Sequence, residues 1–147
     1  MSMIDVTAKP EVYREAKAKG TIKLKSETIR LIREGKVEKG DPFEVAKVAG
    51  ILAAKNTSSL IPLCHPLPLT SVEVKLQIVD DSKVEVETTV KTRAQTGVEM
   101  EALAAAATAL LTVWDMTKQY EKDESGQYPS TSIQNLHVIR KVKEKQT

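Results

Sequence analysis

The chain has 147 residues, of which 41% are hydrophobic, so it can form a single core without a metal or disulfide staple. Its 22 basic and 20 acidic residues are interspersed and give a net charge of +2, and only 3% of its residues are aromatic. These values argue against a basic stripe for duplex nucleic acid and against aromatic stacking of single strands. We expect no nucleic-acid partner.

Residues 1–20 are polar and only weakly periodic, so we predict a mobile arm without the apolar run of a signal peptide. The longest apolar-rich stretch, residues 102–114, is too short and too rich in alanine for a membrane span. Cys64 is the only cysteine, which excludes an intrachain disulfide and favours a reducing compartment. We expect one catalytic domain over residues 1–147, in the cytoplasm and away from membranes.

After a short strand at residues 21–24, Ser26 is expected to cap a helix that continues to about Glu34 and ends at Gly35. A second helix should begin at Asp41, because an acidic N-cap is followed by a proline at the first helical position. It should extend to about Lys55. Its apolar residues form two faces, a stripe of large residues and a face of small ones: Val45, Val48 and Leu52, and Ala46, Ala49, Gly50 and Ala53.

Hydrophobic residues alternate with polar ones over residues 72–78 and again over 84–90, on both sides of a polar turn, which predicts a β-hairpin. Apolar residues at helical spacing predict the longest helix over residues 97–120, and residues 132–142 resemble a last strand. The sum is an α+β fold, an antiparallel sheet with helices packed on one face in a ferredoxin-like arrangement.

Glu101, Thr108 and Asp115 fall in one narrow sector of the long helix, with Lys118 at its edge. Such a sector is often only a solvated face, but here the residues between its two ends are mostly alanines, which permit another element to approach. Glu101 and Asp115 should lie about 21 Å apart along the helix. One chain therefore cannot easily bring both to one small substrate, whereas two antiparallel copies of the helix could. We hypothesise active sites between subunits.

The loop Leu60-Ile61-Pro62-Leu63-Cys64-His65-Pro66-Leu67-Pro68-Leu69 holds a cysteine and a histidine between prolines, which restrict its backbone. This favours rigid presentation of both side chains to a ligand. The alternative is a buried cysteine acting as a small hydrophobe beside a histidine satisfied by backbone bonds. We expect no metal site, because a lone Cys-His pair supplies only two zinc ligands.

Lys39 precedes a helix N-terminus, where free backbone N–H groups favour an anion, although a lysine there is common in proteins. Lys55, at the far end of that helix, would ordinarily interact with the helix dipole. Arg14 would ordinarily be solvated.

Several of these segments resemble one family, the cyclic pyranopterin monophosphate synthases, which are the C proteins of molybdenum cofactor biosynthesis. The resemblance extends nearly continuously over residues 4–120. The proline-rich loop and the start of the long helix together are highly specific. The matching runs are Ile4–Lys9, Lys25–Thr28, Lys39–Asp41, Ala49–Ile51, Ala54–Lys55, Leu60–Leu69, Thr96–Leu103 and Asp115–Lys118.

The resemblance implies a ferredoxin-like subunit in a homohexamer, a trimer of dimers with active sites at the dimer interface. It implies that 3′,8-cyclo-7,8-dihydroguanosine 5′-triphosphate is the substrate, that cyclic pyranopterin monophosphate and pyrophosphate are the products, and that no cofactor takes part. It assigns catalysis to Asp115, Lys118 and Lys39. It assigns substrate binding to Leu63, Cys64, His65, Met100, Glu101, Glu99, Lys55 and Arg14.

These residue types suit the chemistry, because opening and closing rings moves protons and expelling pyrophosphate calls for nearby cations. A lysine beside other cations would have a lowered pKa and could act as a base. The residues leave open which lysine does so. After residue 120 the chain lacks a glycine-rich segment of several relatives, so no contact of that segment is carried over.

Two alternatives remain: a non-catalytic assembly protein, whose alanine-rich helix is an oligomer seam, and another phosphate-handling enzyme such as a pterin or nucleotide hydrolase.

Overall fold

A computed structural model describes residues 1–144 and contains one four-stranded antiparallel sheet and four helices. The strands are β1 (Val12–Lys23), β2 (Leu69–Ile78), β3 (Lys83–Ala94) and β4 (Ser132–Lys143). The helices are α1 (Ser26–Arg33), α2 (Pro42–Lys55), α3 (Thr57–Leu60) and α4 (Glu99–Glu121). The strand order β2-β3-β1-β4 is that of two split β-α-β units, so the predicted ferredoxin-like α+β fold is confirmed.

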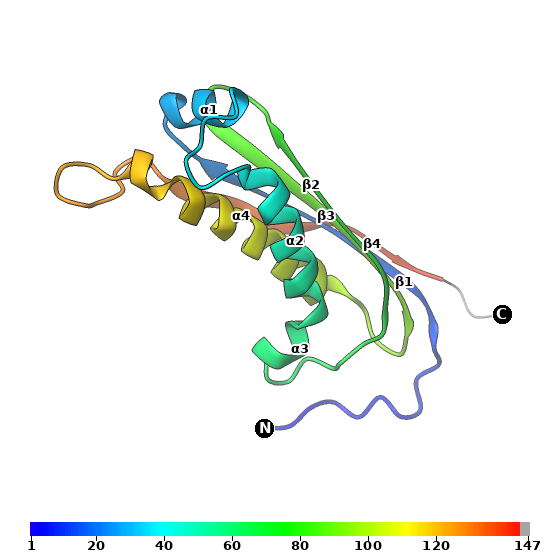
Figure 1. Cartoon of the computed structure of the whole chain (residues 1–147). Helices are drawn as coiled ribbons and strands as arrows, with labels where there is room; N and C mark the ends of the chain where they lie inside the picture. The colour runs from blue at the N-terminus through cyan, green and yellow to red at the C-terminus, as the bar shows by residue number, and fades with distance from the viewer. Residues whose placement is uncertain (145–147) are drawn as a thin grey trace.

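The helices lie on one face of the sheet, and within residues 1–144 no helix covers the other face (Figure 1). Along β1 every second residue is buried under the helices, and the residues between them are partly exposed on the open face. Three successive helix-facing residues in the middle of β1 are small: Ala16, Ala18 and Gly20. A side-chain carbon on Gly20 would lie only 2.9 Å from Cδ1 of Leu110 in α4. Small side chains in β1 therefore let α4 lie close against the sheet.

Residues 12–20 are not part of an arm, contrary to the sequence-based expectation. They belong to β1, which pairs with β3 on one side and with β4 on the other, so β1 lies in the middle of the sheet. The expected strand at residues 21–24 is only the end of this longer strand.

Ser26 is not the N-cap of α1, as the sequence predicted. Lys25 occupies the cap position and its side chain makes no capping bond. Its backbone N–H instead donates to the carboxylate of Glu121, at 3.0 and 3.2 Å, from the end of α4. Glu121 is fully buried and also accepts hydrogen bonds from the hydroxyls of Thr28 and Thr131. A carboxylate from a distant helix thus caps α1, where the helix dipole favours negative charge.

The other predicted elements are confirmed within a few residues. Asp41 caps α2 by accepting hydrogen bonds from the backbone N–H groups of Phe43 and Glu44, and Gly35 ends α1 with a φ of 68°. The hairpin is β2 and β3. The short helix α3 was not expected from the sequence.

Helix α2 packs on α4 through its small residues, because a side-chain carbon on Gly50 would lie 3.1 Å from the backbone oxygen of Ala105. The stripe of large residues on α2 is exposed instead, with Val45, Val48 and Leu52 at 46, 58 and 53% of full exposure. An apolar stripe on the outside of a helix is available to another chain.

Candidate active site

The first site cluster joins the loop between α1 and α2 to the last turns of α4. The side chain of Lys118 lies 3.0 Å from Oδ1 of Asp115, one turn earlier on α4. The ammonium group of Lys39 lies 3.5 Å from Oδ2 of the same carboxylate and donates a hydrogen bond to the backbone oxygen of Asp115 at 3.0 Å. The structure therefore brings together all three residues for which the sequence predicts catalysis.

These contacts favour the charged forms of the pair. The hydrogen bond from Lys118 and the positive charges of Lys118 and Lys39 lower the pKa of Asp115, and the same hydrogen bond and the charge of Asp115 raise the pKa of Lys118. Lys118 is therefore not the lysine with a lowered pKa that the sequence led us to consider. Since the side chains are 42 to 60% exposed, the ion pairs add little stability. Two ammonium groups held at the surface are suited to receiving an anionic ligand.

The second cluster lies at the start of α4, where Glu101 is only 3% exposed. The thiol of Cys64 points to Oε2 of Glu101 at 3.7 Å, and Oε1 is buried without a hydrogen-bond partner among residues 1–144. Burial raises the pKa of Glu101 because it disfavours the charged carboxylate. Burial, with the charge of Glu101, likewise raises the pKa of Cys64. This cluster is thus suited to holding protons rather than to supplying a thiolate nucleophile.

Neighbouring residues make the surface around this second cluster partly apolar. Leu63 and Met100, each next in sequence to a member of the cluster, are 45 and 40% exposed. A ring nitrogen of His65, Nε2, lies 2.7 Å from the backbone oxygen of Ile4, which ties the N-terminal segment to the proline-rich loop. This is the backbone contact that the alternative interpretation of the loop expected for the histidine, and presentation of Cys64 and His65 to a ligand stays a prediction.

Glu99 and Arg14 lie between the start of α4 and the sheet. Burial acts to raise the pKa of Glu99, but a hydrogen bond from Lys141, its own backbone N–H and the charges of Lys141 and Arg14 outweigh burial and lower it. Lys141 reaches Glu99 from β4 at 2.8 Å. Arg14 is buried and donates to the backbone oxygens of Ala94 and Gln95, each at 3.1 Å, so the expected solvated arginine is instead held in place.

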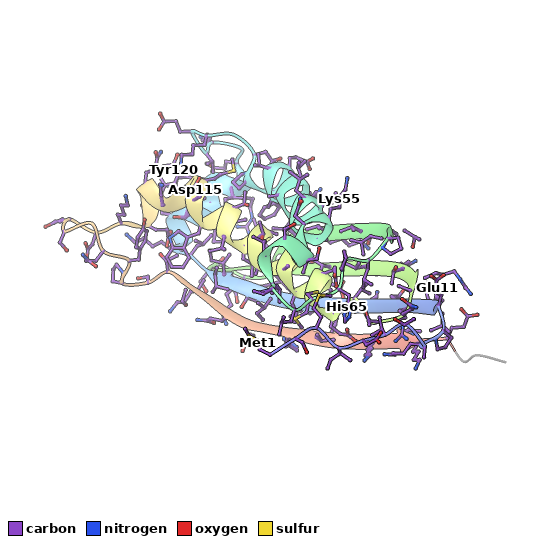
Figure 2. The ribbon with its side chains drawn as sticks, turned by 90° about the horizontal axis from the view of Figure 1, so that it is seen from below. Met1, Glu11, Lys55, His65, Asp115 and Tyr120 are labelled. Atoms are coloured by element: carbon purple, nitrogen blue, oxygen red, sulfur yellow. The ribbon has the colours of Figure 1, made fainter. Side chains whose placement is uncertain are left out.

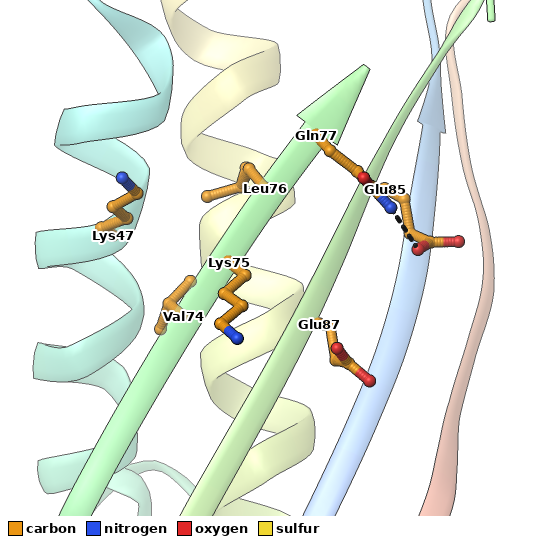
Figure 3. Close-up of a pocket in the computed structure, with 7 residues that line it drawn as sticks. All are labelled: Lys47, Val74, Lys75, Leu76, Gln77, Glu85 and Glu87. Carbon is orange, nitrogen blue, oxygen red and sulfur yellow. Dashed lines mark hydrogen bonds between the residues drawn. The ribbon is translucent and has the colours of Figure 1, made fainter. Parts of the chain in front are cut away.

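Lys55 lies elsewhere, in a cleft of about 370 Å³ between α2 and β2 whose floor includes Ile51, Leu67 and Val72. A further cavity of about 470 Å³ lies along β2, where the side chain of Gln77 donates a hydrogen bond to Glu85 at 3.3 Å (Figure 3). Lys47, Lys75, Glu85 and Glu87 line this second cavity, so its formal charges balance. It contains none of the predicted site residues.

The two clusters occupy opposite ends of α4. Asp115 follows Glu101 by fourteen residues, which is about 21 Å of helix. Figure 2 shows Asp115 near one end of α4 and His65 near the other. Within one chain the two clusters therefore do not meet.

Sequence reasoning missed three residues that contact a predicted site residue or its neighbour in the chain. Lys141 pairs with Glu99, while Tyr120 and Gln119 hold the backbone and side chain of Glu38, next to Lys39. No spacing in the sequence marks these contacts, because each joins segments that only the fold brings together.

Residues 1–144 contain neither a cluster of metal ligands nor a helix suited to a membrane. No group of three or more histidine, cysteine, aspartate and glutamate side chains there could hold a metal ion. Over the same residues, no helix is both long enough and apolar enough to cross a membrane.

The fold and the two clusters define a class of protein: a ferredoxin-like α+β subunit with ionisable groups gathered at both ends of one long helix. The family model of the MoaC family matches residues 3–144, and the chain belongs to this family.

The sequence similarity between this chain and its relatives extends over almost the whole length of both. It is 52% identical over 147 residues to a protein of Pyrococcus furiosus, covering 100% of this chain and 94% of that one. It is 53% identical to a protein of Saccharolobus solfataricus, over 97% of this chain and 95% of the relative. It is 57% identical to a protein of Aeropyrum pernix, over 92% of each. All three carry the name "Probable cyclic pyranopterin monophosphate synthase".

Proposed function

We propose that this protein is a cyclic pyranopterin monophosphate synthase, a lyase of molybdenum cofactor biosynthesis. It converts 3′,8-cyclo-7,8-dihydroguanosine 5′-triphosphate to cyclic pyranopterin monophosphate and pyrophosphate. Membership of the MoaC family, and relatives of that name at 52 to 57% identity, support the proposal. They give no support to a non-catalytic assembly protein.

The observation that carries the proposal is the placement of two lysines on one aspartate, at 3.0 and 3.5 Å. Closing a cyclic phosphate forms a bond from a substrate hydroxyl oxygen to the innermost phosphorus and breaks the bond to the departing pyrophosphate. Negative charge develops on that leaving group, and fixed cations stabilise it. Lys39 and Lys118 supply these cations, and Asp115 accepts or returns a proton as the rings rearrange.

The second cluster binds the other end of the substrate. Glu101, whose pKa is raised by burial, donates or accepts a proton near the pterin ring, and Cys64 and His65 line the same wall. Leu63 and Met100 supply apolar contact, and Glu99 and Arg14 add polar groups beside them. Lys55 lies apart from this cluster within one chain and contributes a cation from its cleft between α2 and β2. These roles are our proposal for the eight substrate-binding residues.

Because the two clusters are about 21 Å apart along α4, each active site takes one cluster from each of two subunits. The subunits form a homohexamer, a trimer of dimers, in the cytoplasm. The exposed apolar residues of α2 and α4, Val45, Val48, Leu52 and Leu111, support burial of this face by another copy.

Incubation of the purified protein with the cyclised triphosphate, followed by product mass, tests the proposal. We expect cyclic pyranopterin monophosphate and one equivalent of pyrophosphate. Release of phosphate alone would instead indicate another phosphate-handling enzyme. A correctly assembled protein that leaves the substrate unchanged would indicate an assembly role.

A further inference from the structure

Lys39 lies in the loop of residues 34–41, which has few anchors of its own. The loop carries two glycines with positive φ, Gly35 at 68° and Gly40 at 119°, and only Val37 in it is buried. The side chain of Lys39 is 42% exposed. A lysine on such a loop needs further contacts if its ammonium group is to stay in one place.

Those contacts come from α4. The backbone N–H of Glu38 donates a hydrogen bond to the hydroxyl of Tyr120 at 2.9 Å, and the side-chain amide of Gln119 donates to the carboxylate of Glu38 at 2.9 Å. Lys39 adds its own bond to the backbone oxygen of Asp115 at 3.0 Å. Three hydrogen bonds thus join two successive loop residues to one end of α4, where Figure 2 places both Asp115 and Tyr120.

We propose that Tyr120, aided by Gln119, is a positioning residue: its hydroxyl fixes the Glu38 backbone and thereby holds the ammonium group of Lys39 beside Asp115. This inference rests on the proposed function only in that Lys39 takes part in turnover. Among residues 1–144, the hydroxyl of Tyr120 accepts one hydrogen bond, from the backbone N–H of Glu38 in the loop. Tyr120 reaches the reaction through Lys39 and is not itself a catalytic residue.

Tyr120→Phe removes only the hydroxyl and leaves the partly buried ring in place. Since one hydrogen bond is lost, we expect kcat to fall about three- to tenfold, with KM and the melting temperature nearly unchanged. Tyr13→Phe is the matched control, because the hydroxyl of Tyr13 donates to Glu15 at 3.0 Å on the open face of the sheet. Its activity should equal that of the unmodified protein.

A double-mutant cycle separates positioning from a general loss of structure. In the Lys39→Ala background, Tyr120→Phe should have almost no further effect on kcat, because the group that it positions is already gone. An equal fall in both backgrounds, or no fall in the unmodified one, would overturn the inference.

Hydrogen exchange supplies a readout independent of turnover. The amide of Glu38 should exchange faster in Tyr120→Phe than in Tyr13→Phe, and Gln119→Ala should give a smaller increase. Unchanged exchange in both α4 variants contradicts the inference even if Tyr120→Phe folds poorly. If the unmodified protein shows no turnover while exchange behaves as expected, the proposed function fails and the contact itself stands.

Discussion

Lys118 and Asp115 lie one helical turn apart on α4, and their side chains form an ion pair of 3.0 Å. Lys39, from a loop far away in sequence, forms a second ion pair with the same carboxylate. One carboxylate thus holds two ammonium groups on an exposed surface. Removing either lysine should leave the fold intact, because exposed ion pairs contribute little to stability.

Lys118→Ala and Lys39→Ala should therefore fold and assemble normally but lose about 10²- to 10³-fold in kcat, the usual effect of removing one group that stabilises developing charge. Pyrophosphate release measures the rate, and thermal melting and size-exclusion chromatography check the fold and assembly. Lys36→Ala, in the same loop and paired with Glu34, is the control. Near-full activity in either active-site variant contradicts the role proposed for that lysine.

Subunit mixing tests the sharing of sites. Glu101→Gln and Asp115→Asn should each be inactive, yet a random mixture of the two should recover about a quarter of the unmodified activity, because half of the dimers are mixed and each mixed dimer has one intact site. The variants are co-expressed with different tags and the mixed assemblies are purified. A mixture as inactive as its parents would show that both clusters serve a site within one chain.

The raised pKa of Glu101 predicts a pH-dependent stability. The unfolded chain loses this proton at about pH 4, whereas the folded chain keeps it to a higher pH. Stability therefore falls as pH rises from the unfolded pKa to the folded one and is constant above it. Glu101→Gln removes this loss, so its melting temperature should exceed that of the unmodified protein at pH 7 by more than at pH 4. Glu124→Gln, at an exposed position in the loop after α4, should show no such difference between the two pH values.

Glu121 should be important for stability rather than for turnover. Glu121→Ala leaves the Lys25 N–H and two threonine hydroxyls without their acceptor in a buried place, so we expect a loss of roughly 2 to 4 kcal/mol in the free energy of unfolding. Glu121→Gln keeps one acceptor oxygen and should lose less. Glu124→Ala, in the exposed loop that follows, should change stability by less than about 0.5 kcal/mol. Chemical denaturation measures all three.

Most of the fold could be predicted because its elements have local signals. The cap at Asp41 and the alternation in β2 and β3 are properties of short segments. Strand β1 has a weaker signal: β-branched residues are buried only at its two ends, Val12 and Ile22, while the buried positions between them are Arg14, Ala16, Ala18 and Gly20. Small residues suit the close approach of α4, but that approach is a tertiary fact that no window of sequence contains.

The site divides in the same way into features with a local signal in the sequence and features that depend on tertiary contacts. The sequence predicted the separation of Glu101 from Asp115, because helical rise fixes it. It also placed Lys39 beside a helix start, but the contact of Lys39 with Asp115 depends on how the loop folds over α4. For the same reason the partner of Glu99 was missed, because Lys141 comes from the last strand.

The position of β1 constrains how the molecule is made. One neighbour of this strand is β4, residues 132–143, which is synthesised after all the other helices and strands described here. Until then β1 has an open edge of unpaired backbone groups, next to a helix that already carries both Glu101 and Asp115. The nascent chain can thus form its helical layer before β4 is available to complete the sheet.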